Sequence, residues 1–474
     1  MATPVIVAID SSTSACKAVV FDLSGATVAE TRHHLQQSSP RPGWSEQAAE
    51  QWVDGALTAL AAVTDLLAPH HHPVGLAITH QRESFVCLDE AGRPLRPAIL
   101  WNDRRCRAQA EELGTAAIGH RTGKPPSTVP SLYKLRWLAE HEPQVLASTG
   151  LVADVHSFLA LLLTGRAVAA RSSADALGLL NLDTGDWDPD LVTECGLVPG
   201  QLPEIAAAGT RIGSLTAEAA RRTGLPEGLP VIAGGGDGQC AGLGVGAWSA
   251  GAGYLNLGTS VSLGAFTTRR GVYPGARTMV AHQPGLFAVE TLQVSGAASL
   301  TWFAESFGMD DALVAAAAQV PPGCEGLRFV PYLSGRQTPC WDPDASGGFS
   351  GLRPEHRRPQ LYRAVLEGLA LDQRMCLAYL RSEAGIRIDR VILTGGVGQS
   401  NLATRIFAAA LDIPVSLSRE RECTALGAAI LAAPACDSRY ATVAEAAAGM
   451  VGSTEPVEVD AAVAEAYRLL PDPA

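Results

Sequence analysis

The chain has 474 residues, with 36 basic and 48 acidic side chains and a formal net charge of −12. Nucleic acids and anionic membranes are bound through clustered Lys and Arg, so this acidic balance argues against both as partners. Hydrophobic residues make up 47% of the chain, and at roughly 100 to 200 residues per domain the length predicts roughly two or three domains with cores of their own.

Only three of the basic residues are lysine, namely Lys17, Lys124 and Lys134. None of them is followed by Ser or Thr, so the sequence contains no Walker P-loop. The ten cysteines form no C-x-x-C pair, which argues against zinc sites and disulfides and favours a reducing compartment. The first residues lack the positive region of a signal peptide, and no uncharged apolar run reaches the ~18 residues of a spanning helix. We therefore expect a soluble cytoplasmic protein.

The opening of the chain predicts a meander of strands. Short apolar runs rich in β-branched residues predict strands at 4–9, 17–21 and 26–29. The turn between the first two, Asp10 to Ser14, consists of small polar residues. A helix is predicted next over 45–67, with Ser45 as its N-cap.

A block of polar residues follows the next predicted strand, 74–78, and it contains Gln81, Arg82 and Glu83. Charged groups placed directly at the end of a core strand are typical of a functional site. A lone Arg–Glu pair is more often a surface ion pair, so both interpretations stay open at this point.

The middle of the chain predicts a strand over 231–233 that meets three glycines, Gly234 to Gly236, and then Asp237. Glycines in a turn allow a ligand or another backbone to approach closely. A carboxylate at the end of such a turn indicates a general base or a metal ligand. The alternative is a turn aspartate that bonds its own backbone.

The second half repeats the pattern of the opening. Strands are predicted over 254–257 and 261–266 around a small polar turn, and a βαβ unit is predicted by the strand 390–394, the helix 401–411 and a strand near Val415. Two hydroxyl-bearing hairpins, one per half, imply two similar halves that face a shared cleft. Their backbone N–H and hydroxyl groups would grip the phosphates of a nucleotide.

These hairpin turns resemble the phosphate loops of the FGGY carbohydrate kinases, which belong to the actin-like ATPase superfamily. Residues 10–17 resemble the first loop, with Ser12 where the family usually has Gly. Residues 258–259 resemble the second phosphate loop, and residues 394–396 with Ser400 resemble the adenosine loop.

The family's two signatures extend the resemblance over most of the chain, from about Val5 to about Ala433. Residues 131–138 are similar to the first signature, and residues 347–352 together with 360–367 match the second throughout. The resemblance implies an α/β fold in which two actin-like (ribonuclease H-like) ATPase domains flank a nucleotide and sugar cleft.

Within that fold, residues 1–242 are expected to form an N-terminal, sugar-binding domain and residues 243–474 a C-terminal, nucleotide-binding domain. A hinge near residues 237–248 would close the domains over the substrates. The implied activity is ATP-dependent phosphorylation of a hydroxyl on a small sugar, with Mg²⁺ as the second cofactor.

The resemblance also assigns roles to single residues. Asp237 is the expected general base, because a sugar hydroxyl needs one when it attacks the γ-phosphoryl group. Asp10 is the expected Mg²⁺ ligand, with Asp237 nearby. The expected ATP-binding residues are Ser12, Thr13, Ser14, Lys17, Gly258, Thr259, Gly395, Gly396 and Ser400. The expected substrate-binding residues are Gln81, Arg82, Glu83, Asp103 and Asp237. Replacement of Lys17 is expected to impair activity, and replacement of Lys124 to do little.

The acceptor is the least determined part of the prediction. Residues 42–47 and 96–103 resemble xylulokinases, whereas residues 81–83 resemble the polyol grip of glycerol kinases, and Val129 stands where those kinases have an aromatic residue. We favour a ketopentose such as xylulose or ribulose, with glycerol or a four-carbon polyol next. A non-catalytic sugar-binding regulator is the alternative of another class, and it would be expected to lose Asp237 or the phosphate loops. The expected partner is a small sugar or polyol, with a homodimer as an open alternative.

Overall fold

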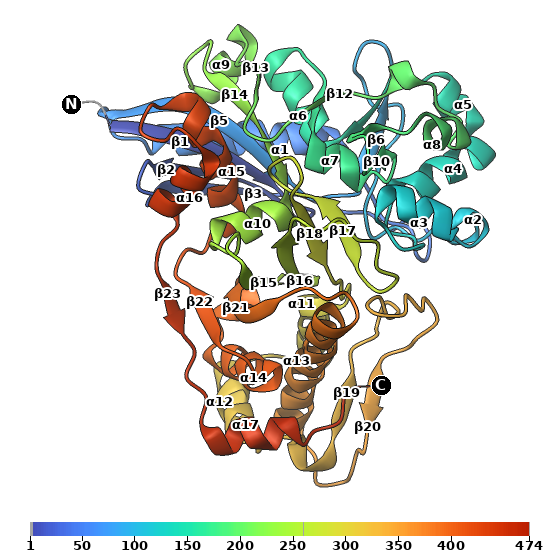
Figure 1. Ribbon diagram of the computed structural model, residues 1–474, viewed down its shortest axis with the longest axis vertical. Coiled ribbons are helices and arrows are strands. Elements are labelled where there is room, and N and C mark those ends of the chain that lie inside the picture. Colours follow the sequence, from blue (N-terminus) through green and yellow to red (C-terminus); the bar gives the residue numbers. More distant parts are fainter. Residues whose placement is uncertain (1–2, 259, 474) are drawn as a thin grey trace.

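The computed structural model describes residues 3–258 and 260–473. The chain forms two lobes, each built on its own mixed β-sheet, with the N-terminal half in the upper lobe of Figure 1 and most of the C-terminal half in the lower one. None of the helices within the described residues is long and apolar enough to cross a membrane.

The first sheet has six strands in the order β13-β14-β5-β1-β2-β3. Its strands are β1 (Thr3–Ser11), β2 (Ala15–Asp22), β3 (Thr27–His34), β5 (His71–His80), β13 (Arg211–Ser214) and β14 (Pro230–Gly236). β1 pairs antiparallel with β2 and parallel with β5, and β14 is parallel to β5. The predicted opening meander is therefore confirmed.

The second sheet has seven strands in the order β17-β18-β16-β15-β21-β22-β23. Its strands are β15 (Gly251–Leu257), β16 (Val261–Thr267), β17 (Arg277–Val280), β18 (Phe287–Glu290), β21 (Ile388–Thr394), β22 (Val415–Ser418) and β23 (Thr454–Pro456). β15 pairs antiparallel with β16 and parallel with β21, and β22 is parallel to β21. This pairing repeats that of β1, β2, β5 and β14, which confirms two similar α/β halves.

Helices cover both faces of the first sheet. α1 (Glu50–Asp65) and α6 (Val155–Thr164) pack on one face. α15 (Cys423–Cys436) and α16 (Val443–Met450) pack on the other, so two helices late in the chain return to the upper lobe. In the lower lobe, α13 (Arg358–Ser382) and α14 (Asn401–Leu411) pack on the second sheet.

α10 (Asp237–Gly244) joins the two lobes and packs against α15. Glycines make this contact close, because a Cβ on Gly244 would lie 1.9 Å from the carbonyl oxygen of Cys423, and one on Gly427 would lie 2.0 Å from that of Cys240. The two backbones therefore approach to a distance that side chains would forbid, and Asp237 at the start of α10 is held by this contact.

The remaining elements form smaller layers around the two sheets. A four-stranded sheet in the upper lobe contains β4 (Glu46–Gln47), β6 (Phe85–Leu88), β7 (Ala98–Ile99) and β8 (Leu151–Asp154). The other upper-lobe elements are α2 (Arg107–Leu113), α3 (Ala116–Thr122), α4 (Ser131–His141), α5 (Pro143–Ala147), β9 (Val168–Ala170), α7 (Arg171–Ala176), β10 (Leu180–Asn181), β11 (Asp186–Trp187), α8 (Pro189–Glu194), β12 (Glu204–Ala206) and α9 (Ala217–Thr223). The lower lobe adds α11 (Gly296–Phe307), α12 (Asp311–Ala318), β19 (Arg328–Val330), β20 (Gly348–Ser350) and α17 (Ala461–Arg468).

The predicted helix start at Ser45 is wrong. α1 begins at Glu50, and its N-cap position is Ala49, which makes no side-chain cap bond. Residues 46–47 form β4 and pair with β7, and the backbone N–H of Ser45 donates to Asp103 at 2.6 Å. Pairing with a distant strand therefore outweighs the local capping preference.

Candidate active site

A polar cavity of about 270 Å³ lies between the two lobes, and both sheets contribute to its walls. Of the residues singled out from the sequence, it is lined by Asp10, Ser12, Thr13, Ser14, Gln81, Arg82, Glu83, Asp237 and Gly258. The structure thus brings together the expected first phosphate loop, the polar block after β5 and the glycine of the expected second loop, which lie far apart in the sequence.

Asp10 lies near the end of β1 and is only 8% exposed. Burial raises its pKa to about 7, although Lys17 opposes the shift, and Glu422 and Asp237 add to it. A buried carboxylate near other carboxylates gains a great deal from a cation. Within residues 3–258 and 260–473, no group of three or more His, Cys, Asp or Glu side chains is arranged to hold a metal ion. The feature that bears on a cation is the Asp10 carboxylate itself, a hard oxygen ligand on the cavity wall, which suits an ion such as Mg²⁺ that keeps several waters.

Asp237 is the first residue of α10 and follows directly after β14. Its Oδ1 forms an ion pair with Nε of Arg82 at 2.9 Å and accepts a hydrogen bond from the backbone N–H of Gly238 at 2.8 Å. The side chain is still 39% exposed, toward the cavity that it lines. Its enclosed position raises the pKa of Asp237 above that of an ordinary aspartate, while Arg82 opposes the shift. Such a carboxylate has the proton affinity and the access that a general base needs.

The glycines around Asp237 do not form the predicted turn. Gly234 to Gly236 end β14, and Gly238 lies in the first turn of α10. A Cβ on Gly236 would lie 2.5 Å from Cδ of Arg82, and one on Gly238 would lie 2.5 Å from Oε1 of Glu290. The expected close approach is therefore present, but what approaches is the charged network of the site.

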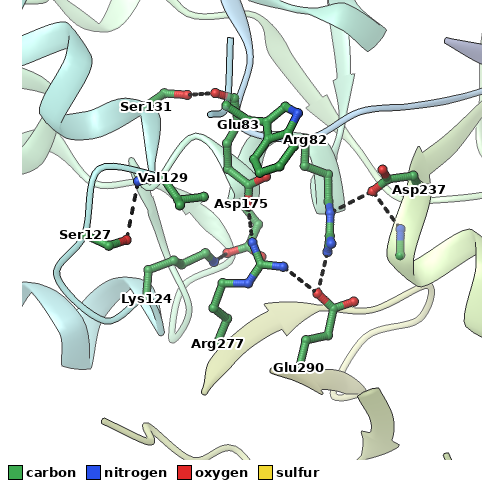
Figure 2. A network of polar contacts seen from close by, with 12 residues as sticks. Arg82, Glu83, Lys124, Ser127, Val129, Ser131, Asp175, Asp237, Arg277 and Glu290 are labelled. Atoms are coloured by element: carbon green, nitrogen blue, oxygen red, sulfur yellow. Dashed lines mark hydrogen bonds and ion pairs between the residues drawn. The ribbon is translucent and has the colours of Figure 1, made fainter. Parts of the chain in front are cut away.

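Arg82 connects Asp237 to the buried Glu290, as Figure 2 shows. Its Nη1 donates to Oε2 of Glu290 at 2.8 Å and to Oε1 of Gln239 at 3.0 Å. Glu290 has no solvent exposure, and its other carboxylate oxygen accepts from the hydroxyl of Tyr254 at 2.6 Å. Burial alone would raise the pKa of Glu290, but Arg82 and Arg277 hold it below its ordinary value. Glu290 is therefore a buried anion that fixes the guanidinium next to Asp237.

Glu83 is held by a residue of the other lobe. Nη1 of Arg277 donates to Oε1 of Glu83 at 2.9 Å, and Nη2 donates to Oε2 of Glu290 at 3.1 Å (Figure 2). Arg277 lies at the start of β17 in the lower lobe, and it also lines the cavity. The polar block after β5 thus belongs to an interlobe network of charges rather than to a surface ion pair.

The first phosphate loop is ordered by its own hydroxyl groups. Oγ of Ser12 donates to the carbonyl of Ala15 at 2.9 Å. The φ of Ser12 is not positive, so the backbone at this position does not require glycine. Oγ1 of Thr13 donates to Gln81 and accepts from the indole N–H of Trp101, both at 3.0 Å. Ser14 is exposed. Thr259, expected in the second loop, lies outside the described residues.

Lys17 lies next to the first phosphate loop but its ammonium is already engaged. Nζ donates to both carboxylate oxygens of Glu422, at 2.8 and 2.6 Å. Lys17 is absent from the lining of the 270 Å³ cavity. Its expected contact with phosphate therefore requires that Glu422 release it.

Lys124, expected to be unimportant, is buried and forms an ion pair with Asp175. The Asp175 side chain has no exposure, and its Oδ2 also accepts from the backbone N–H of Val280. The small effect on turnover and ATP affinity stays a prediction, but removal of Lys124 would leave a buried carboxylate without its counter-charge and should therefore lower stability.

Asp103 is not brought into the cavity. It is fully buried, and its two oxygens accept hydrogen bonds from Arg105 and from the backbone N–H of Ser45. The neighbouring Trp101 and Asn102 line the cavity instead. Asp103 thus orders the segment that carries these two side chains, and its expected contact with substrate is not among those that the cavity assembles.

The expected adenosine loop lies further out, in the lower lobe. Gly395 lines a hollow of about 390 Å³, and Ser400 lines a different one of about 760 Å³ beside α12 and α14. The hydroxyl of Ser400 accepts from the backbone N–H of Ala403 and caps α14. Gly396 begins the short 3-10 segment between them, Gly396–Gln399.

Arg277 and Glu290 lie outside every motif named above. Both are strand residues among apolar neighbours, in the segments Arg-Thr-Met-Val and Phe-Ala-Val-Glu. A charged side chain within an apolar strand must either be buried with a partner or lie at the edge of the sheet. This placement is the one sequence signal that could have indicated Arg277 and Glu290.

Comparison with known proteins agrees with this architecture. Family models of the FGGY family of carbohydrate kinases match residues 5–244 for the N-terminal domain and residues 253–436 for the C-terminal domain. The chain therefore belongs to the FGGY family of carbohydrate kinases. It is a carbohydrate kinase, and the kinases of this family use ATP with a sugar or polyol as acceptor.

Individual relatives carry two different names. The chain is 34% identical to a xylulose kinase of Escherichia coli (strain K12) over 421 residues, which cover 85% of this chain and 84% of that protein. It is 32% identical to a glycerol kinase of Alkalilimnicola ehrlichii over 452 residues, which cover 91% and 90%. The crystal structure of xylulose kinase from Rhodospirillum rubrum superimposes with a TM-score of 0.86 at 31% identity, covering 98% of this chain and 96% of that one.

Proposed function

We propose that this kinase transfers the γ-phosphoryl group of ATP to a hydroxyl of a ketopentose such as xylulose or ribulose, with Asp237 as the general base. The observation that carries the proposal is the placement of Asp10, Asp237 and the Arg82–Glu83 pair on the walls of one cavity. At about 270 Å³ this cavity is slightly smaller than the ~300 to 1,000 Å³ common for small-molecule sites, which suits a small acceptor.

In the proposed reaction, Asp237 accepts the proton of the attacking hydroxyl. Its deprotonated Oδ1 is oriented by Nε of Arg82 and by the Gly238 amide, so the carboxylate is held before the acceptor arrives. A positioned base of this kind contributes roughly 10²- to 10⁴-fold to the rate. Arg82 and Glu83 would bind neighbouring hydroxyls of the acceptor, because a guanidinium donates and a carboxylate accepts.

The phosphate end of the site would be formed by the first hairpin turn and by Gly258. Asp10 would hold Mg²⁺, with Asp237 nearby, and the ion when bound neutralises charge on the transferred group. The hydroxyl of Thr13 lines the cavity and could turn from Gln81 to a phosphate oxygen. Thr259 and Ser14 keep their proposed phosphate contacts, and Gly395, Gly396 and Ser400 would bind the adenosine.

The acceptor pocket is not closed on the side of Val129. Val129 lines a second cavity of about 600 Å³, which shares Gln37 and Asn102 with the first. An acceptor longer than glycerol can therefore extend toward this second cavity. Together with the similarity to xylulose kinases, this openness favours five carbons over three.

Glycerol or a four-carbon polyol is the second candidate. The specific observation in its favour is the charged pair Arg82 and Glu83, both less than 10% exposed at the cavity wall. Such a pair suits a small acceptor whose hydroxyls are all alike, and the similarity to a glycerol kinase points the same way.

Closure of the two lobes would complete the site. We propose a division of the chain between residues 242 and 243, after which α15 and α16 return to the upper lobe, with α10 as the segment about which the lobes move. Because α10 carries Asp237 at its start, movement of this helix would bring the already oriented base against the acceptor as the cavity closes and water is excluded.

The test is an ADP-release assay with ATP, Mg²⁺ and a panel of xylulose, ribulose, glycerol and erythritol. We expect a ketopentose to give the highest kcat/KM, and Asp237→Asn to lower turnover by roughly 10²-fold or more with that acceptor. A higher value for glycerol or erythritol selects the second candidate. If no acceptor stimulates ADP release, the proposal is overturned.

A further inference from the structure

Within residues 3–258 and 260–473, Arg277 is the one guanidinium of the lower lobe that binds Glu83 and Glu290. It is 194 positions from Glu83 in the sequence, and both side chains are nearly buried, at 4% and 5% exposure. The same guanidinium binds Glu290, which lies on the adjacent strand β18 (Figure 2). One side chain therefore connects the hydroxyl-binding part of the upper lobe to the sheet of the lower lobe.

The backbone conformation of Glu83 is an unfavourable one that neighbouring contacts must stabilise. Its φ is 58°, in the left-handed region that side-chain-bearing residues adopt only where neighbouring contacts impose it. Two such contacts are present. The hydroxyl of Ser131 donates to the backbone carbonyl of Glu83 at 3.0 Å, and Arg277 donates to its carboxylate at 2.9 Å. Ser131 fixes the backbone, so the orientation of the carboxylate depends on Arg277.

The two oxygens of Glu83 are in different situations. Oε1 is bound by Arg277, whereas Oε2 accepts no hydrogen bond from residues 3–258 and 260–473. Because Glu83 lines the cavity, Oε2 is the oxygen left for a hydroxyl of the acceptor. Rotation of the carboxylate would move this acceptor atom, and fixing Oε1 therefore fixes where a substrate hydroxyl must lie.

The charges alternate along the network from Glu83 through Arg277, Glu290 and Arg82 to Asp237. Glu290 accepts from both guanidinium groups on the same atom, Oε2. Arg277 is thus two contacts from Arg82, which orients the proposed base. A change at Arg277 that acted through Glu290 would disturb the base, whereas one that acted through Glu83 would disturb acceptor selection.

We propose that Arg277 is a positioning residue that determines acceptor specificity: it fixes the Glu83 carboxylate from the opposite lobe, so that one particular hydroxyl of the acceptor is recognised. The inference rests on the proposed function, since it requires that the acceptor bind beside Glu83. It assigns the lower lobe a part in choosing the sugar as well as in binding the nucleotide. It also couples selection to closure, because the contact exists only while the lobes are together.

The test uses the full chain and the best acceptor of the panel, whichever sugar or polyol that is. Arg277→Met is expected to raise the KM for the acceptor by roughly 10- to 100-fold, the size of a lost hydrogen bond between charged groups. The KM for ATP should change less than about 3-fold, and Arg277→Lys should recover part of the loss because it keeps one charged donor. Monodeoxy analogues of the acceptor should show which hydroxyl is involved, since the variant loses discrimination at that carbon alone.

A double-mutant cycle keeps the proposal falsifiable if Arg277→Met is less stable. Glu83→Gln and Arg277→Met should each raise the acceptor KM, and the double variant should be little worse than either, because both act on the same contact. Independent, multiplying effects would overturn the proposal.

The control is Arg270→Met, which removes another ion pair between the lobes, Arg270 with Asp183, whose side chains are 23% and 60% exposed and line neither cavity. We expect it to leave acceptor discrimination unchanged. An equal effect of both variants would mean that Arg277 only ties the lobes together, and the proposal would fail. A wild-type chain inactive with every acceptor would instead overturn the proposed function, so the two failures are distinguishable.

Discussion

Lys17 and Glu422 lie 405 positions apart in the sequence and form an ion pair of 2.6 Å. Lys17 is on β2 beside the first phosphate loop, and Glu422 occupies the N-cap position of α15. Asp10 lies opposite Lys17 in the register of β1 and β2. The ammonium is therefore paired with Glu422 and acts on Asp10 only through its charge, which lowers the pKa of that carboxyl. A phosphate group that enters the cleft must compete with Glu422 for the ammonium.

Replacement of Lys17 should impair the use of ATP. With Lys17→Ala, turnover should fall and the KM for ATP should rise by roughly 10- to 100-fold, because a charged donor to phosphate is lost. Steady-state kinetics at a saturating acceptor concentration measure both. Glu422→Gln should move the KM for ATP in the opposite direction, since it frees the ammonium.

Arg221→Ala is the matched control for this experiment. Arg221 is an exposed cation on α9 that pairs only with Glu218 of the same helix within the described residues. Its loss should leave both kinetic constants unchanged. An unaltered KM for ATP in Lys17→Ala would show that Lys17 serves only the ion pair with Glu422.

Most of the fold follows from local patterns that the sequence displays openly. Runs such as residues 4–9 and 261–266 are short, apolar and rich in β-branched residues, and small polar turns separate them, so the strands and the duplication of the two halves could be predicted. The true start of α1 could not be predicted. The capping pattern at Ser45 competes with strand pairing between residues 46–47 and residues 98–99, and no local feature of the sequence predicts that pairing.

The site divides in the same way. Asp10, Arg82, Glu83 and Asp237 each follow a predicted strand, and the edge of a parallel sheet brings such residues together. Arg277 could not be assigned, because its meeting with Glu83 depends on how two separate sheets face each other. Asp103 is a residue type that often binds substrates, but its carboxylate already accepts hydrogen bonds from Arg105 and from the backbone N–H of Ser45.

The pH dependence of activity should reflect the raised pKa of Asp237. Burial raises this pKa and Arg82 lowers it, with a net shift upward from the ordinary 3.8. A general base works only when deprotonated, so kcat/KM for the acceptor should fall as the pH drops through this raised pKa. Profiles of kcat/KM against pH should therefore show an acid limb above the range of an ordinary aspartate.

Arg82→Met should move that acid limb to still higher pH, because the cation that favours the charged carboxylate is gone. Arg107→Met, which removes a guanidinium paired with Asp344 at the cleft, should leave the limb in place. A limb that stays fixed in Arg82→Met would contradict the assignment of Asp237 as the titrating group.

Lys124→Ala should destabilise the protein by about 3–5 kcal/mol, the usual result of breaking a buried ion pair from one side. The ammonium is 2% exposed and Asp175 is fully buried, so the remaining carboxylate would keep its desolvation cost without its partner. Urea unfolding measures the difference. Lys124→Met combined with Asp175→Leu should lose less than Lys124→Ala alone, because no unpaired charge remains. A double variant less stable than the single one would contradict this account.

Gly244→Ala distinguishes the effect of helix propensity from the effect of packing between α10 and α15. Propensity alone predicts a gain of about 1 kcal/mol for Ala over Gly within a helix. The added Cβ of α10 would, however, lie 1.9 Å from the carbonyl oxygen of Cys423 on α15, and overpacking of this kind costs about 1–3 kcal/mol. We therefore expect a lower melting temperature, together with a lower kcat because α10 carries Asp237. Gly200→Ala, where no atom lies within 4 Å of the added Cβ, should change neither. A Gly244→Ala variant as stable and as active as the parent would show that α10 and α15 can move apart at little energetic cost. That result would contradict the proposal that their contact holds Asp237 in place.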